Sequence, residues 1–273
     1  MELGKKTLVM GILNVTPDSF SDGGESFTLD SAISNALQLE ADGANIIDIG
    51  GESTRPGSDP VSTEEELRRV IPIIEELSKQ LKIPISVDTY KSDVAEAAIR
   101  SGARIVNDIS GGSFDPGMPK LVLDTSVGVI LMHIKGEPKN MQIDPTYRDV
   151  RIEVGDFLRD AVRKFTSIGV PKENIMVDPG IGFGKRFEHN ISLMKGSNEF
   201  RELSAGVLVG SSRKSFLGKI TGNEVSNRVS ESVSAAVISV MYGADVVRVH
   251  DVKEVVHAVR VADAFRDIGK LGI

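Results

Sequence analysis

Acidic, amide and cationic side chains follow a series of short apolar runs in this chain of 273 residues. They are Asn14, Glu52, Asp88, Asn107, His133, Asp178, Ser212 with Arg213 and Lys214, and Arg248 with His250. Carboxylates and amides form paired hydrogen bonds with the edge of a flat heterocycle, and cations bind an anionic group on the same ligand. If the fold brings these residues to one face, they form a pocket for a flat, hydrogen-bonding, partly anionic ligand.

The elements that must position these side chains are eight apolar runs with the length and composition of buried strands. We predict strands at Leu8–Val15, Asn45–Gly50, Ile85–Asp88, Arg104–Ile109, Gly128–His133, Ile175–Asp178, Gly206–Gly210 and Val246–His250. The segments between them have helical periodicity, as in Thr63–Leu81, for which Ser62 is the expected N-cap, and Asp149–Ile168. The chain is therefore expected to alternate strand and helix eight times.

A repeated unit marks the passage from helix to strand. The pattern Gly-Ala-x-apolar-apolar-polar begins at Gly43, Gly102 and Gly243. Each glycine follows an amphipathic stretch and is expected to supply a left-handed C-cap before a buried strand. Eightfold alternation at this length predicts an α/β protein with a single (β/α)8 barrel domain over residues 1–273, in which the carboxyl ends of the strands meet on one face. The alternative is an open six-stranded sheet, which requires the first and seventh strands to be wrong.

Two long segments separate the predicted elements on the side of the polar residues. Thr16–Phe27 and Ser53–Ser62 are rich in Gly, Ser, Pro and Asp. Loops of this length in a barrel commonly bind ligands or close over them, and Arg55 would bring a charge over the ligand. The alternative is that both are solvated loops without a role in binding.

Composition limits the classes of function. The chain has no cysteine, which excludes disulfides and thiolate catalysis and fits a reducing, cytoplasmic compartment. A net charge of -7 argues against nucleic-acid binding. No apolar run reaches the roughly 20 residues of a membrane helix. Lys5–Leu13 has a charged and then apolar pattern like that of a signal peptide, but no small-residue cleavage site follows, and we interpret it as the first strand.

Several single motifs allow other chemistry. Asp88 and Asp178 are a possible glycosidase pair, although the chain has no Trp and only three Tyr to stack on sugars. Lys214 is a possible Schiff-base lysine, but the adjacent Arg213 favours an anion-binding rim. Asp178–Lys185 is glycine-rich but is not a phosphate-binding P-loop, because no Ser or Thr follows its lysine.

The histidines do not have the spacing of a zinc site. His133 and His250 both end predicted strands, whereas His189 and His257 lie in predicted helices. A Mg2+ ion shared between a phosphate substrate and the side-chain oxygen of Asn14 fits the residues better.

Taken together, the motifs resemble those of the dihydropteroate synthases from end to end of the chain. The matching segments are Gly11–Gly24, Gly51–Gly57, Ser86–Thr89, Asn107–Ile109, Met132–His133, Asp178–Lys185, Ser212–Ser215 and Arg248–Val252. The resemblance implies condensation of 7,8-dihydropterin-6-ylmethyl diphosphate with p-aminobenzoate, giving 7,8-dihydropteroate and pyrophosphate. It also implies Mg2+ as cofactor and a homodimer.

The resemblance further implies a role for each site residue. The pterin would contact Asp88, Asn107, Ile109, Met132, Asp178 and Lys214. The diphosphate would contact Asn14, Arg55, Arg248 and His250, with Asn14 also binding Mg2+. The p-aminobenzoate pocket would be formed by Thr54, Pro56, Phe183, Lys185 and Ser212. The residues expected to act in catalysis are Asp88, Asp178, Lys214, Asn107 and Arg55.

Two alternatives to this activity stay open at the level of the sequence. A pterin-binding methyltransferase barrel, acting with a corrinoid partner protein, shares the pterin-facing Asp and Asn residues, but the Arg55 loop and Ser212–Ser215 count against it. A non-catalytic pterin-binding module is the other. For the homodimer, the small residues Ser232–Ala236 would permit close helix packing between subunits, and a buried contact within one chain explains them equally well.

Overall fold

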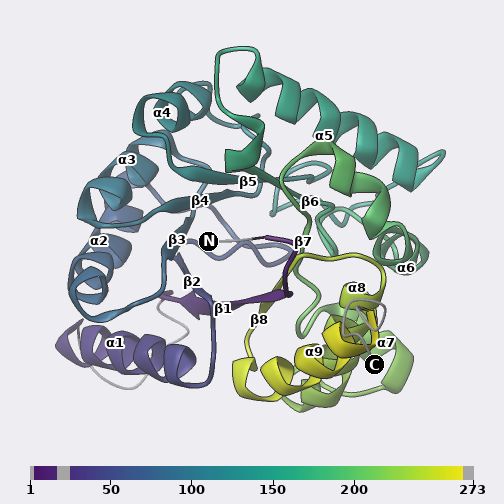
Figure 1. The fold of residues 1–273 in the computed structure, drawn as a ribbon. Helices are drawn as coiled ribbons and strands as arrows, with labels where there is room; N and C mark the ends of the chain where they lie inside the picture. Colours follow the sequence, from purple (N-terminus) through teal and green to yellow (C-terminus); the bar gives the residue numbers. More distant parts are fainter. Residues whose placement is uncertain (1–2, 17–24, 267–273) are drawn as a thin grey trace.

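The computed structural model describes residues 3–16 and 25–266, which form a barrel of parallel strands surrounded by helices (Figure 1). The strands are β1 Leu8–Asn14, β2 Ile46–Gly50, β3 Ile85–Asp88, β4 Ile105–Asp108, β5 Gly128–Met132, β6 Ile175–Asp178, β7 Leu208–Val209 and β8 Val246–Val249. The helices are α1 Glu25–Ala41, α2 Thr63–Gln80, α3 Ser92–Ser101, α4 Met118–Thr125, α5 Val150–Thr166, α6 Phe187–Lys195, α7 Ser215–Thr221, α8 Val229–Met241 and α9 Val252–Arg266. Short 3-10 turns cover Lys172–Asn174, Ser197–Leu203 and Val225–Asn227.

The order of the strands confirms the predicted (β/α)8 barrel. Neighbouring strands follow the order β6-β5-β4-β3-β2-β1-β8-β7, and all of these pairs are parallel. A bridge between Val177 and Val207 joins β6 to the segment before β7 and closes the ring. The open-sheet alternative is wrong, because β1 is a full strand of 7 residues paired on both sides.

The seventh strand is shorter than the predicted Gly206–Gly210. Only Leu208–Val209 has ladder pairing. The side chain of Asp245 replaces part of the ladder, since its Oδ2 accepts a hydrogen bond from the backbone N–H of Val207 at 3.0 Å. Just before the strand, the carboxylate of Asp245 therefore accepts the hydrogen bond that a carbonyl of a neighbouring strand would accept in a regular ladder.

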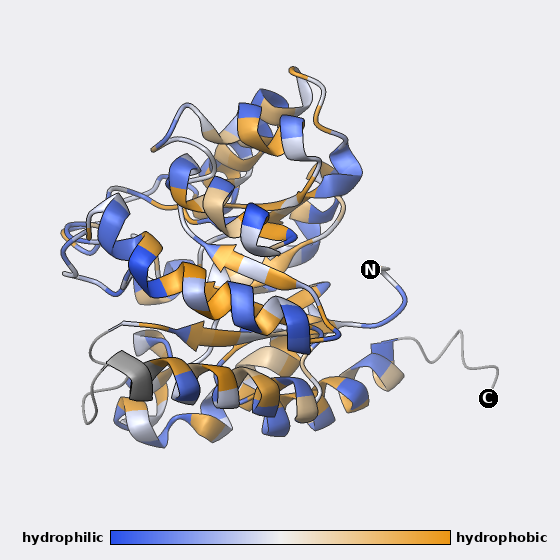
Figure 2. Ribbon diagram, turned by 90° about the vertical axis from the view of Figure 1, so that its left-hand side faces the viewer, coloured by the Kyte–Doolittle hydropathy of each residue, from blue (hydrophilic) through white to orange (hydrophobic). Residues whose placement is uncertain are grey.

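Side chains alternate between the inside of the barrel and the layer under the helices. The lower interior is filled by apolar residues, Leu8, Met10, Ile46, Ile105, Ile130, Met176, Leu208 and Val246. The opposite faces of the strands pack against the helices in one large apolar layer, and Figure 2 shows the hydrophobic strands beneath helices of mixed polarity. The polar positions predicted as the site lie one step further along the strands, toward their carboxyl ends.

The predicted helix boundaries are largely confirmed. The three glycines that open the repeated unit have positive φ, 103° at Gly43, 123° at Gly102 and 100° at Gly243. At Gly102 a Cβ would lie 2.5 Å from Cβ of Ser78, so α2 and α3 pack closely only because this residue has no side chain. Ser62 caps α2, its Oγ accepting a hydrogen bond from the N–H of Glu65 at 3.2 Å.

The predicted loops differ in how far the structure describes them. Helix α1 begins at Glu25, so the first loop ends before the predicted Phe27, and residues 17–24 lie outside the described residues. The second loop runs from β2 to α2 without regular structure, as predicted. No helix in the described part of the chain is both long and apolar enough to cross a membrane.

Candidate active site

A buried charge cluster lies inside the barrel at the carboxyl ends of β2, β3, β4 and β8. Arg248 donates from Nε to Oδ2 of Asp48 at 2.6 Å and from Nη2 to Oδ2 of Asp88 at 2.7 Å. Asn107 donates from Nδ2 to the same Asp48 oxygen at 3.0 Å. These contacts fix the planes of a guanidinium and a carboxamide inside the barrel, at the carboxyl ends of the strands.

Asp48 belongs to this cluster but was not predicted as a site residue from the sequence. Its side chain is fully buried, and its second oxygen, Oδ1, has no hydrogen-bond partner among the described residues. A signal was present, because Asp48 interrupts the apolar run of a parallel strand that is buried on both faces. A charge in such a strand requires a partner inside the fold.

Two predicted pterin residues, Asp178 and Lys214, lie near one another at the other side of the mouth. Asp178 accepts a hydrogen bond from the N–H of Gly180 through Oδ1 at 2.7 Å, and its other oxygen makes no hydrogen bond within the described chain. Lys214 places Nζ 4.0 Å from the centre of the Phe183 ring. The pair offers a carboxylate acceptor and a cationic donor to one ligand edge.

Burial shifts the acid–base behaviour of these groups. It raises the pKa of Asp88 to about 7, although the adjacent Arg248 opposes the rise, and it raises the pKa of Asp178 to about 6. Burial, together with the charge of Arg248, lowers the pKa of Lys214 to about 8. Three groups of the mouth therefore titrate near neutral pH, as is common where binding or catalysis takes place.

An apolar wall stands beside these polar groups. Ile109, Met132 and Phe183 are buried in one cluster with Ile134 and Met141. Ile109 follows β4, Met132 ends β5, and Phe183 comes from the glycine-rich turn after β6. The arrangement suits a flat ring that is apolar on its faces and polar at its edge.

Lys185, predicted for the aminobenzoate pocket, lies under the glycine-rich turn instead of facing open space. Its Nζ donates to the carbonyl of Phe183 at 2.8 Å and lies 2.9 Å from Nδ1 and 3.3 Å from the carbonyl oxygen of His133. Its three N–H bonds thus have acceptors inside the protein. Burial lowers the pKa of Lys185, and it also lowers the pKa of His133 to about 2, so that the imidazole is a neutral acceptor.

Gly180 makes this close approach possible. Its φ is 68°, and a Cβ there would lie 1.9 Å from the carbonyl oxygen of His133. Only glycine fits the turn against the end of β5. The buried Lys185 and His133 pair therefore holds the segment that carries Asp178 and Phe183.

Two residues predicted for different substrates are in contact on the other side of the mouth. The Oγ of Ser212 lies 3.1 Å from Nδ1 of His250 and accepts a hydrogen bond from its backbone N–H at 3.3 Å. Arg213 pairs through Nε with Oδ2 of Asp251 at 3.1 Å, joining the loops after β7 and β8. Burial lowers the pKa of His250 to about 3, so its imidazole is neutral at neutral pH.

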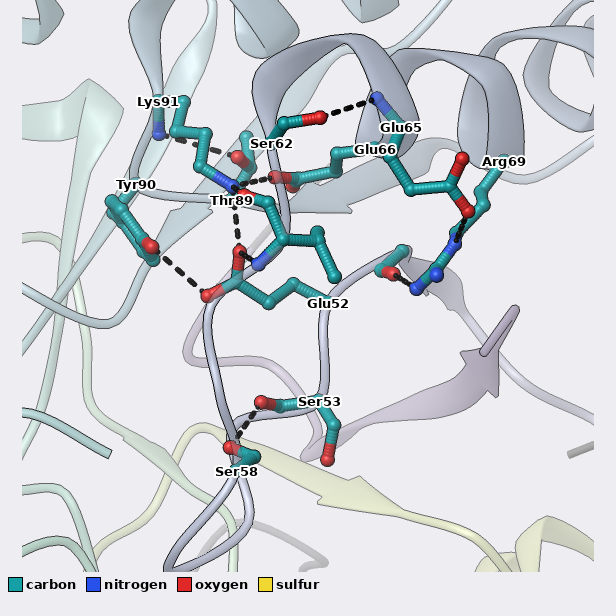
Figure 3. Close-up of polar contacts among 12 residues, drawn as sticks. Glu52, Ser53, Ser58, Ser62, Glu65, Glu66, Arg69, Thr89, Tyr90 and Lys91 are labelled. Carbon is teal, nitrogen blue, oxygen red and sulfur yellow. Dashed lines mark hydrogen bonds and ion pairs between the residues drawn. The ribbon is translucent and has the colours of Figure 1, made fainter. Parts of the chain in front are cut away.

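Glu52 does not belong to the pocket, contrary to its inclusion among the converging strand-end residues. Its carboxylate accepts from Nζ of Lys91 at 2.6 Å and from the hydroxyl of Tyr90 at 2.9 Å (Figure 3). The loop that follows carries Thr54, Arg55 and Pro56. Arg55 is exposed, and its guanidinium makes no ion pair with a described residue.

The described residues contain no group of three or more His, Cys, Asp or Glu side chains that could hold a metal ion. Asn14, at the end of β1, is half-buried, and its carboxamide has no hydrogen bond to the described residues. A single neutral oxygen suits Mg2+ only where a substrate supplies further ligands, which is how Mg2+ is usually held beside phosphates.

Comparisons with known proteins agree with this geometry. Residues 10–250 match the model of the pterin-binding enzyme family. The dihydropteroate synthase of Escherichia coli K12 is 47% identical over 94% of this chain and 90% of its own length.

Solved structures extend the agreement to the fold. A dihydropteroate synthase from Clostridium difficile, crystallised in the presence of pteroic acid, superposes with a TM-score of 0.91 at 45% identity, covering 97% of this chain and 98% of that one. The enzyme from Xanthomonas albilineans with 4-aminobenzoic acid gives a TM-score of 0.90 at 44% identity, covering 96% and 94%. The chain belongs to the pterin-binding enzymes and, among them, to the dihydropteroate synthases.

Proposed function

We propose that this chain joins 7,8-dihydropterin-6-ylmethyl diphosphate to p-aminobenzoate, releasing pyrophosphate and 7,8-dihydropteroate. The observation that carries the proposal is that Asp178 and Asn107 are buried at the strand ends, while Lys214 lies against Phe183 of the apolar cluster. The ligands named for the related structures, pteroic acid and 4-aminobenzoic acid, correspond to the two halves of such a product. Their similarity to this chain at 44 to 45% identity supports the same chemistry here.

The pterin would occupy the polar floor of the mouth. Asp178 would accept paired hydrogen bonds from the amidine-like edge of the pyrimidine ring, with Asn107 beside it, and Lys214 would donate to the ring carbonyl and a ring nitrogen. Asp88 would lie at the other side of the ring. Met132, together with Ile109, would pack against the ring face. Asp48 holds Asn107 and Arg248 in place for these contacts.

The diphosphate would lie toward β1 and β8. Arg55 and Arg248 would supply cations, and the neutral imidazole of His250 would donate one hydrogen bond. Mg2+ fits this place, because the Asn14 carboxamide, which has no hydrogen bond to a described residue, would offer one oxygen and the diphosphate would offer others. When bound, Mg2+ would neutralise part of the charge on the departing pyrophosphate.

The aminobenzoate pocket would be formed by the loop after β2 and the segments after β6 and β7. Thr54 and Pro56 would line one side, while Phe183 and Ser212 would line the other. Lys185 acts on this pocket indirectly, since its ammonium is occupied by internal acceptors and holds the turn that carries Phe183.

The reaction follows from the charges. The bond between the pterin methylene carbon and the diphosphate oxygen breaks, and its electrons leave with pyrophosphate. The arylamine nitrogen then forms the new bond to carbon and loses a proton to water. Positive charge that develops on the pterin is stabilised by the carboxylates of Asp88 and Asp178. A neutral arylamine needs no general base to attack.

A homodimer is proposed through helices α8 and α9. The predicted contact through Ser232–Ala236 does not carry it, because Ser232, Ala235 and Ala236 are buried within the chain. Apolar side chains exposed on or beside these two packed helices are Ile238, Met241, Tyr242, Val261 and Phe265. Their number on adjacent helices favours an interface, since exposed apolar patches of this kind mark association sites.

Pyrophosphate release tests the proposed function. The substrate diphosphate is incubated with the protein and Mg2+, with and without p-aminobenzoate. We expect release that depends on the aminobenzoate. Pyrophosphate release at the same rate without p-aminobenzoate would show a diphosphate hydrolase. Pterin binding without any release would indicate a non-catalytic pterin-binding module.

A further inference from the structure

A buried ion cluster, here named the Lys91 clasp, joins the two ends of the loop between β2 and α2. It consists of Glu52, Val61, Glu66, Tyr90 and Lys91. The ammonium of Lys91 donates to Oε2 of Glu52 at 2.6 Å, to Oε2 of Glu66 at 2.6 Å and to the carbonyl of Val61 at 2.9 Å. All three of its N–H bonds are thereby used within the clasp (Figure 3).

The clasp joins the two ends of the loop, which together form its stem. Glu52 stands at its start and Val61 at its end, and Oε2 of Glu52 accepts a hydrogen bond from the N–H of Val61 at 3.2 Å. Both backbone groups of Val61 are therefore fixed, the N–H by Glu52 and the carbonyl by Lys91. Lys91 lies between β3 and α3, directly before α3 begins. Its contacts therefore attach the two ends of the loop to the next strand and helix of the barrel, in addition to joining them to each other.

The charges in the clasp are costly to bury, which argues for a specific role. The side chains of Lys91, Glu52 and Glu66 are 15%, 5% and 1% exposed. Oε1 of Glu66 has no partner in the described part of the chain, and burial raises the pKa of Glu66. Apolar side chains would fill such a space at a similar or lower cost in folding free energy. They would, however, leave the backbone N–H and carbonyl of Val61 without hydrogen-bond partners, whereas the clasp holds both groups in place.

The far side of the same loop is attached to the rest of the described chain by one backbone hydrogen bond and one exposed ion pair. The N–H of Gly57 donates to the carbonyl of Pro138 at 3.0 Å. Lys139 pairs with Asp59 at 2.7 Å, but these side chains are 66% and 76% exposed. An exposed pair of this kind adds little to stability and is screened by salt. The buried stem therefore determines the position of the loop more than its tip does.

From these contacts we infer that Lys91 is a positioning residue for the condensation reaction. It acts through the loop and sets where Thr54, Arg55 and Pro56 stand over the mouth of the barrel. The inference rests on the proposed function, in which these loop residues contact the aminobenzoate and the diphosphate. The polar residues proposed for the pterin floor, Asn107, Asp178 and Lys214, make no side-chain hydrogen bond to the clasp among the described residues, although the Tyr90 ring packs against the apolar cluster beside them.

Replacing Lys91 by Met tests the inference, because Met keeps most of the length and removes the charge and the donors. With saturating pterin diphosphate, we expect KM for p-aminobenzoate to rise at least tenfold. The Kd of a bare pterin without the diphosphate, measured by calorimetry, should change less than twofold. Lys91→Arg should recover part of the lost affinity, because it restores a cation with several donors.

Matched variants separate positioning from general damage. Lys139→Met breaks the exposed tip pair and should leave KM within twofold of the wild type. Tyr90→Phe removes only one hydrogen bond of the clasp and should raise KM for p-aminobenzoate modestly, which provides a test even if Lys91→Met does not fold. In the wild type without ligand, the amide of Val61 should exchange with solvent more slowly than that of Asp59.

Two results would overturn the inference while leaving the proposed function intact. One is a wild-type KM for p-aminobenzoate in both Lys91→Met and Tyr90→Phe. The other is an equal loss of bare pterin binding in Lys91→Met, which would show damage to the whole barrel. Failure of the wild-type protein to release pyrophosphate would instead contradict the proposed function itself.

Discussion

The buried carboxylate of Asp48 gives the sharpest prediction, because one oxygen holds two residues of the proposed pterin and diphosphate site. Oδ2 accepts from Arg248 Nε at 2.6 Å and from Asn107 Nδ2 at 3.0 Å. Asp48→Asn keeps an oxygen in that position and removes the charge. A charged hydrogen bond contributes about 1.5 to 3 kcal/mol and a neutral one about 0.5 to 1.5 kcal/mol. In the variant the bond from Asn107 becomes neutral, whereas the bond from Arg248 keeps the guanidinium charge, so the expected loss is about 1 to 1.5 kcal/mol.

A loss of this size in the transition-state complex that the free protein does not share corresponds to about a tenfold fall in kcat/KM for the pterin diphosphate. Initial rates of pyrophosphate release at low substrate measure it. Asp48→Ala should lose more, because it leaves the Asn107 amide without an acceptor and Arg248 with Asp88 alone. Urea denaturation should show the same order of stabilities.

Ser86 provides the matched control for Asp48. It is the register partner of Asp48 on β3, fully buried, and its Oγ has no hydrogen-bond partner among the described residues. Ser86→Ala removes no hydrogen bond and should leave kcat/KM and stability nearly unchanged. A kcat/KM for Asp48→Asn within twofold of the wild type would refute the view that Asp48 organises the site.

Three further predictions concern the mouth of the barrel. Asp178→Asn should weaken binding of a bare pterin by about a hundredfold or more in calorimetry, since it replaces an acceptor by a donor at the ligand edge, whereas His189→Ala should have little effect. Asp178 has a pKa of about 6 and must be ionised to accept the paired hydrogen bonds, so the pterin Kd should rise about tenfold as the pH falls from 7 to about 5. The pterin Kd should also rise above the pKa of Lys214, about 8, because the lysine then loses its charge. Arg55→Ala should weaken binding of the diphosphate ester while leaving the bare pterin unchanged; equal weakening in calorimetry would contradict the assigned role.

The barrel could be predicted from sequence because its signals are local. Strands of a parallel barrel are buried on both faces and so appear as short apolar runs, and the glycines with positive φ at Gly43, Gly102 and Gly243 end helices within a few residues of the next strand. The polar residues at the strand ends mark the active face for the same reason.

The directions of the polar side chains could not be predicted in the same way. Glu52 turns to Lys91, 39 residues away, and Lys185 turns to His133, 52 residues away. Arg248 is fixed by Asp48 across 200 residues of chain. Such pairs depend on which strands become neighbours and on the space left between them, and no local spacing encodes this.

The identity of the product tests the central claim most directly. The protein is incubated with Mg2+, the dihydropterin diphosphate and p-aminobenzoate, in parallel with Asp178→Asn, and the product is identified by mass. We predict that the wild type forms dihydropteroate and one equivalent of pyrophosphate, at a rate far above that of the variant. Pterin binding without dihydropteroate, or equal rates for the two proteins, would contradict the account.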